Sequence, residues 1–76
     1  MGRREMAWQT HMTRTELKAA GAYHMQGHAL LIVGDEGAYY SFDTTREGGA
    51  NHWFKLSKTI PITDQHRAML PTLNKF

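Results

Sequence analysis

The sequence lacks cysteine altogether and contains only two prolines. Without cysteine the chain has no disulfide and no thiolate metal ligand, which fits an intracellular protein. Long apolar runs are missing too, since the longest, Ala29 to Val33, is far shorter than the roughly 18 residues that span a bilayer. Arg3 and Arg4 are followed by no apolar segment of the kind found in secretory signals. We therefore expect a cytoplasmic protein without a membrane partner.

A strong charge of one sign is also absent, because nine basic and seven acidic residues leave a net charge of +2. The basic residues are scattered along the chain, so a mixed solvated surface is the first interpretation and a basic binding patch is the alternative. No phosphate-binding loop, nucleophile elbow or dinucleotide fingerprint occurs in the sequence. We expect no cofactor.

The hydrophobic fraction of 41% is too high for a disordered chain. A chain of this length buries only about 60% of its unfolded surface, which keeps a homodimer open as an alternative to a monomer. We expect a single globular domain over residues 13–72 and a loose tail over residues 73–76. Residues 1–12 are expected to form an arm that is either disordered or an addition to the natural chain.

Helix signals lie on both sides of the apolar middle of the chain. Thr13 and Glu16 have the spacing of a capping box, and Gly21 can supply the left-handed residue at which a helix ends. These signals predict a short helix over residues 14–20. A second short helix is expected over residues 64–70, with a polar cap at its start.

Three segments between these helices have the composition of strands, namely residues 23–33, 38–43 and 52–57. A tight turn at residues 34–37 and a longer polar loop at residues 44–51 connect them. The order of elements predicts an α+β fold, a small three-stranded antiparallel meander with a short N-terminal and a short C-terminal helix (α-β-β-β-α) on one face. A small all-β barrel is the alternative.

Alternation along the strands divides their side chains between two faces. The predicted core consists of Leu30, Ile32, Tyr40, Phe42, Phe54 and Leu56, with Leu17 and Leu70 packed on it. Tyr39 and Trp53 then point away from that core, near the cations Lys55 and Arg46. Aromatic rings with cations at their rim are typical of binding surfaces. The candidate partner-binding residues are therefore Tyr39, Trp53, Lys55 and Arg46.

This pattern favours a small non-enzymatic binding protein that inhibits or regulates a protein or nucleoprotein partner by covering its surface. Compact inhibitors of this build, short and without cysteine or cofactor motifs, occur among the accessory proteins of phage and mobile elements. Aromatic residues on an open sheet with basic neighbours also suit nucleic acid. A nucleic-acid-binding module is therefore a further alternative.

The five histidines suggest an enzyme as the remaining alternative. His24 and His28 are too far apart on a single extended strand to share a metal, so we expect no metal site. His24, His28 or His52 could act as acid or base beside Tyr40 or Asp43, as in metal-free RNA cleavage. The element order and the Gly27-His28 pair are faintly similar to HicA-type messenger-RNA interferases, over Glu16 to Phe42. That resemblance implies a histidine-dependent ribonuclease toxin, with His28 and His24 as the alternative catalytic residues.

Overall fold

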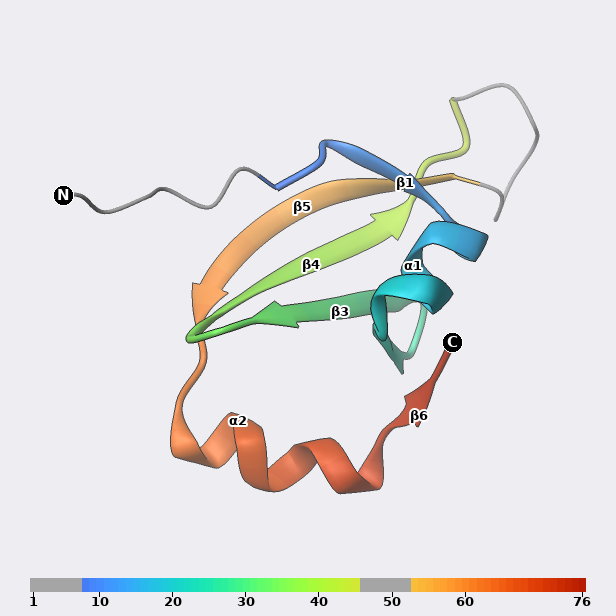
Figure 1. Ribbon diagram of the computed structural model, residues 1–76. Helices are drawn as coiled ribbons and strands as arrows, with labels where there is room; N and C mark the ends of the chain where they lie inside the picture. Colours follow the sequence, from blue (N-terminus) through green and yellow to red (C-terminus); the bar gives the residue numbers. More distant parts are fainter. Residues whose placement is uncertain (1–7, 46–52) are drawn as a thin grey trace, which may run out of the picture.

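The computed structural model describes residues 8–45 and 53–76 (Figure 1). Nine elements follow one another along these residues: β1 (His11–Thr13), α1 (Arg14–Ala20), β2 (Tyr23–Met25), β3 (His28–Val33), β4 (Glu36–Phe42), β5 (Trp53–Pro61), α2 (Asp64–Met69), the 3-10 helix η1 (Leu70–Thr72) and β6 (Asn74–Lys75). The strands form one antiparallel sheet in the order β1-β5-β4-β3-β2-β6. The sheet curls into a half-barrel, with β1 and β6 at its two edges.

The predicted three-stranded meander with both helices on one face is therefore wrong. The segment expected as one long strand is a hairpin, because the chain turns at Gln26-Gly27, where Gly27 has a φ of +82° that favours glycine. Short segments at both ends of the chain add the edge strands. A closed small barrel, the alternative, is not formed by the described residues either, because the edge strands β1 and β6 pair with β5 and β2 and not with each other.

Helix α1 forms as its sequence signals predict. The Glu16 N–H donates to Thr13 Oγ1 at 3.1 Å, and the Thr13 N–H donates to Glu16 Oε1 at 2.8 Å. Gly21 ends the helix with a φ of +83°. Helix α1 buries Leu17 against the sheet. None of the helices within the described residues is long and apolar enough to cross a membrane.

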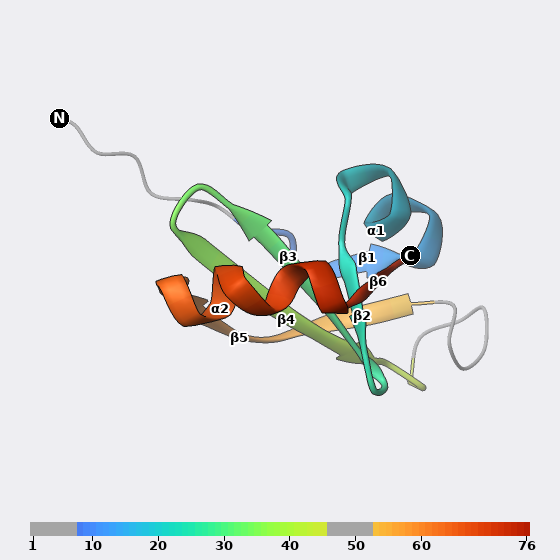
Figure 2. The same ribbon diagram turned by 90° about the horizontal axis from the view of Figure 1, so that it is seen from below.

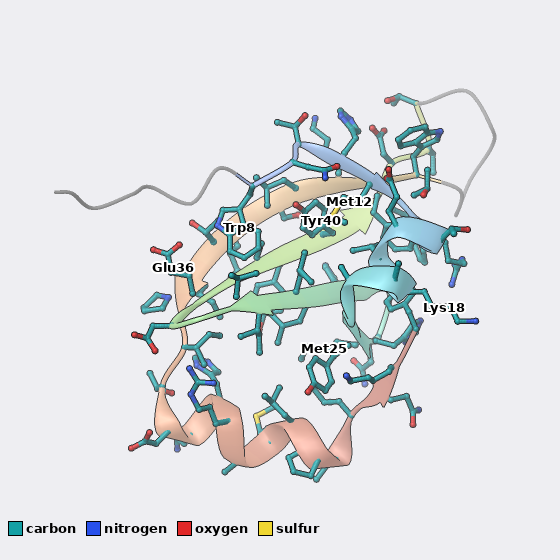
Figure 3. The ribbon with its side chains drawn as sticks, in the orientation of Figure 1. Trp8, Met12, Lys18, Met25, Glu36 and Tyr40 are labelled. Atoms are coloured by element: carbon teal, nitrogen blue, oxygen red, sulfur yellow. The ribbon has the colours of Figure 1, made fainter. Side chains whose placement is uncertain are left out.

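The main core fills the concave face of the half-barrel. Its buried members are Met12, Leu17, Ala22, Ala29, Leu31, Ala38, Tyr40 and Phe54, and Trp8, Phe42, Leu56 and Phe76 pack against them. Trp8, Met12 and Tyr40 come together here from the N-terminal segment and β4 (Figure 3). The Tyr40 hydroxyl donates to the Gln9 carbonyl at 2.6 Å, and burial raises the pKa of this phenol. The chain from Trp8 onward is thus part of the folded domain.

Leu30 and Ile32 lie on the opposite, outer face, so their predicted place beside Tyr40 is wrong. Leu30 pairs with Tyr39 across the sheet, and its side chain points the same way as that tyrosine. Ala29 and Leu31 occupy the concave face in their place. Strand β3 is apolar on both sides, and therefore its sequence does not reveal which residues face the main core.

Helix α2 and η1 cover part of the outer face, opposite the face that α1 covers. Figure 2, a view from this side, shows α2 lying across the strands. At one end the Ile62 N–H donates to the Asp35 carbonyl at 2.8 Å, and Arg67 donates to the Gly34 carbonyl at 2.8 Å. At the other end β6 pairs with β2, and the Phe76 N–H donates to the Ala22 carbonyl at 3.1 Å. We call the segment from Ile62 to Lys75, which contains α2, η1 and β6, the strap. Residues 73–76, expected as a loose tail, thus hold the strap to the sheet edge.

Candidate functional site

An open groove of about 990 Å³ lies on the outer face, between the sheet and the part of the strap formed by η1 and β6. It is lined by His24, Met25, Gln26, His28, Tyr39, Ser57, Lys58, Thr72, Leu73 and Asn74. Among the described residues, the lining includes one lysine, two histidines and several amide or hydroxyl groups, but no carboxylate. A groove of this composition favours an anionic ligand that presents hydrogen-bonding groups.

Tyr39 is the aromatic centre of the groove. The Lys58 Nζ lies 5.3 Å from the centroid of the Tyr39 ring, within the range of a cation–π contact. The His28 ring meets Tyr39 edge-on, with the ring centroids 6.5 Å apart and an interplanar angle of 85°. The groove therefore presents a partly exposed aromatic ring with a cation over it.

Lys58 reaches this position because of a β-bulge. Tyr40 pairs with Leu56 while the preceding Tyr39 pairs with Lys58, so Ser57 is an extra residue in β5. Plain alternation from Phe54 and Leu56 would place Lys58 in the apolar core. Lys58 is not among the binding residues predicted from the sequence. The unfavourable burial of an unpaired ammonium group was the available signal that the alternation breaks before it.

Three of the four predicted partner-binding residues share this outer face. Lys55 is exposed and pairs with Ser41, which follows Tyr39 on the same side of β4. Trp53 precedes Lys55 on the same side of β5 and lies farther along the sheet than Tyr39. The fourth residue, Arg46, lies outside the described residues, as does most of the loop before Trp53.

The two histidines predicted as alternative catalytic residues both border the groove, but the register of the β2–β3 hairpin places His24 on the side of Ala29 and His28 on the outer side. His52, the third candidate, lies outside the described residues. His24 pairs with Ala29 and packs on the Phe76 ring, with the centroids 5.0 Å apart. His28 pairs with Met25 on the outer face, and its Nδ1 lies 3.2 Å from the Gln26 carbonyl. Within residues 8–45 and 53–76, neither ring contacts a carboxylate, and no three potential ligands gather as a metal site. The geometry does not bring these histidines together as an acid–base pair.

The residues expected to assist those histidines have other partners. The Tyr40 hydroxyl is bonded on the concave side, away from His28. Asp43 is 7% exposed and bonds to His11, with Asp43 Oδ2 and His11 Nε2 2.9 Å apart. The Thr45 hydroxyl donates to Asp43 Oδ1 at 2.6 Å and the Thr45 N–H does so at 3.0 Å. These bonds, those from Thr45 first and that from His11 after them, hold the pKa of Asp43 below its ordinary value.

The lysines of the outer face and the carboxylates around the β3–β4 turn lie at opposite ends of the sheet. Lys55 and Lys58 stand at the groove and beside it. The exposed carboxylates Asp35 and Asp64 lie at the other end, around the β3–β4 turn and the start of α2, where Arg67 donates to Asp35 Oδ1 at 3.3 Å. Glu36 is at the same end of β4, but it shares the concave side with Ala38. In Figure 3, Glu36 lies at this far end of the sheet and Met25, at the groove, lies away from it. The two lysines are therefore distant from these carboxylates and remain available to an anionic group at the groove.

Comparisons with protein-family models, with curated proteins and with solved structures gave no match for this chain. The groove's own geometry is therefore the basis for assigning a function.

Proposed function

We propose that the protein is a small non-enzymatic binding protein that holds an anionic segment of a protein or nucleoprotein partner in its outer-face groove. The observation that carries this proposal is the contact between Lys58 and Tyr39 in a groove to which residues 8–45 and 53–76 contribute no carboxylate. The protein would inhibit or regulate its partner by covering the bound segment. It would thus be a compact cytoplasmic protein of the phage or mobile-element accessory type.

The composition of the groove supports binding. A tyrosine offers a large contact area and loses little conformational entropy when it is fixed, and cations at the rim attract an oppositely charged partner. The two histidines near the groove give less support to catalysis, because the register of the hairpin places them on different sides and they lack an orienting carboxylate in the described part of the chain. Binding is therefore the better supported of these two functions.

Retention on a heparin column tests this proposal without assuming the chemical class of the partner. Lys58→Ala and Lys18→Ala remove the same charge, but Lys18 is exposed on α1, away from the groove. We expect Lys58→Ala to elute at a clearly lower salt concentration than the wild type, and Lys18→Ala to elute close to it. Equal shifts for both variants would mean that only net charge matters and would refute the groove as the binding site.

A further inference from the structure

We infer that the anionic segment is a single-stranded nucleic acid, which runs over the outer face from Tyr39 to Trp53 with its phosphates at Lys58 and Lys55. This inference rests on the proposed function and specifies the ligand of the same site. It uses an aromatic residue outside the groove lining, and it excludes a nucleic-acid duplex and an acidic peptide as the preferred ligands.

The register of the sheet aligns these residues along one path. Tyr39 pairs with Lys58, Ser41 pairs with Lys55, and the Asp43 N–H donates to the Trp53 carbonyl at 2.9 Å. Tyr39, Ser41 and Asp43 follow one another at intervals of two residues along β4 and the residue after it. At about 3.3 Å per residue, the levels of Tyr39 and Trp53 are therefore about 13 Å apart. Two aromatic rings thus stand on one face, with Lys58 at the level of Tyr39 and Lys55 at the level between the two rings.

Trp53 is held at the far end of this path. It is partly exposed, and its ring meets the His11 ring edge-on, with the centroids 6.5 Å apart and an interplanar angle of 81°. The nearby Asp43 carboxylate is buried and receives bonds from His11 and Thr45. The oxygens of that carboxylate are therefore occupied by these partners and do not lie open to a phosphate group passing over Lys55.

The spacing of rings and cations favours a nucleic acid over an acidic peptide. Unpaired bases stack on aromatic side chains whatever their sequence, while the linking phosphates contact lysines. An acidic peptide would use the lysines but would gain little from two separate rings. In a duplex the base faces are already stacked on one another, so the rings would have nothing to bind.

The direct test is fluorescence anisotropy with a labelled oligothymidylate of about 12 nucleotides, a length within the range of known single-strand sites. We expect Tyr39→Ala and Trp53→Ala each to weaken binding by roughly 5- to 150-fold, which is the range measured for the loss of one stacked base. Tyr39→Phe and Trp53→Phe keep a ring in place and should retain most of the affinity. Circular dichroism of each variant confirms that the fold is intact.

The dependence of binding on salt provides an independent readout. Each phosphate contact on a single strand contributes about 0.7 to the slope of log affinity against log salt concentration. Lys55→Gln and Lys58→Gln should each lower the magnitude of the slope by about that amount, whereas Lys18→Gln should leave it unchanged. If all three variants lower the magnitude of the salt slope equally, the proposed path of the single strand over Lys58 and Lys55 is overturned.

Competition separates this inference from the proposed function. Polyglutamate and duplex DNA of matched charge should compete at least tenfold more weakly than the unlabelled single strand. If polyglutamate competes equally while heparin retention still depends on Lys58, the inference is overturned and the proposed function stands. If heparin retention does not depend on Lys58 and the single strand does not bind, both are overturned.

Discussion

The two faces of the curled sheet differ in what they bury. The concave face is filled by side chains from β1, α1, β3, β4 and β5, and Leu17, Tyr40 and Phe54 are its largest fully buried members. On the outer face neither α2 nor η1 contributes a buried residue. That face has an aliphatic contact near Gly37 at one end and the polar groove at the other. Stability therefore depends mainly on the concave face, which leaves the outer face able to carry function.

The largest expected effect comes from the concave face. Phe54 is 1% exposed and packs on the Phe42 and Phe76 rings. Phe54→Ala should cost about 3–5 kcal/mol of unfolding free energy, enough to unfold much of so small a domain. Urea denaturation followed by circular dichroism measures this loss. A Phe54→Ala protein with wild-type stability would contradict the assignment of the main core to this face.

The next effect comes from the aliphatic end of the outer face. A Cβ atom on Gly37 would stand 2.7 Å from Ile62 Cδ1 and 3.2 Å from Leu30 Cδ1. Gly37→Val should therefore push the strap away and cost about 1–3 kcal/mol, the range for overpacking. Thr59→Val, on an exposed residue of the neighbouring strand, is the control and should change thermal stability little. Equal melting temperatures for both variants would show that the strap does not pack here.

A smaller, pH-dependent effect is expected at Asp43. Because its pKa is lower in the folded protein than the ordinary value of 3.8, Asp43 stabilises the fold above that value. This stabilisation disappears as the pH falls through the lowered pKa. Asp43→Asn should therefore be less stable than the wild type at neutral pH, and the difference should shrink below about pH 4. Thr45→Val removes the bond with the largest influence and should show the same trend in part.

Urea midpoints between neutral pH and pH 2.5 measure this difference. A gap between wild type and Asp43→Asn that stays constant over the whole range would show that the carboxylate of Asp43 is not specifically stabilised in the fold.

The elements that the sequence predicts well are those with strong local signals. The capping box at Thr13 and the glycine at position 21 define α1. Alternation correctly places Tyr40 and Phe54 on one face, because both strands have one apolar and one polar side. The edge strands β1 and β6 have only a few residues each, and their pairing depends on distant parts of the chain, so no local pattern indicates them.

The candidate site was predictable only in part for a related reason. Tyr39 and Lys55 follow from alternation along β4 and the start of β5. Lys58 does not, because the bulge at Ser57 reverses the alternation after Leu56. The wall of the groove depends on the fold of the strap, whose ends are fixed by contacts between residues far apart in the sequence, such as that of Arg67 with the Gly34 carbonyl.

The separation of the two faces is tested most directly by measuring thermal stability and oligothymidylate affinity on the same sample of a Tyr39→Ala/Lys58→Ala double variant. The loss of a partly exposed cation–π contact costs about 0.5–1 kcal/mol, so the melting temperature should fall by only about 2–8 °C. The affinity at a temperature where the variant is fully folded should fall at least tenfold. An affinity equal to that of the wild type, or a loss that only follows the unfolded fraction, would contradict the assignment of binding to the outer face.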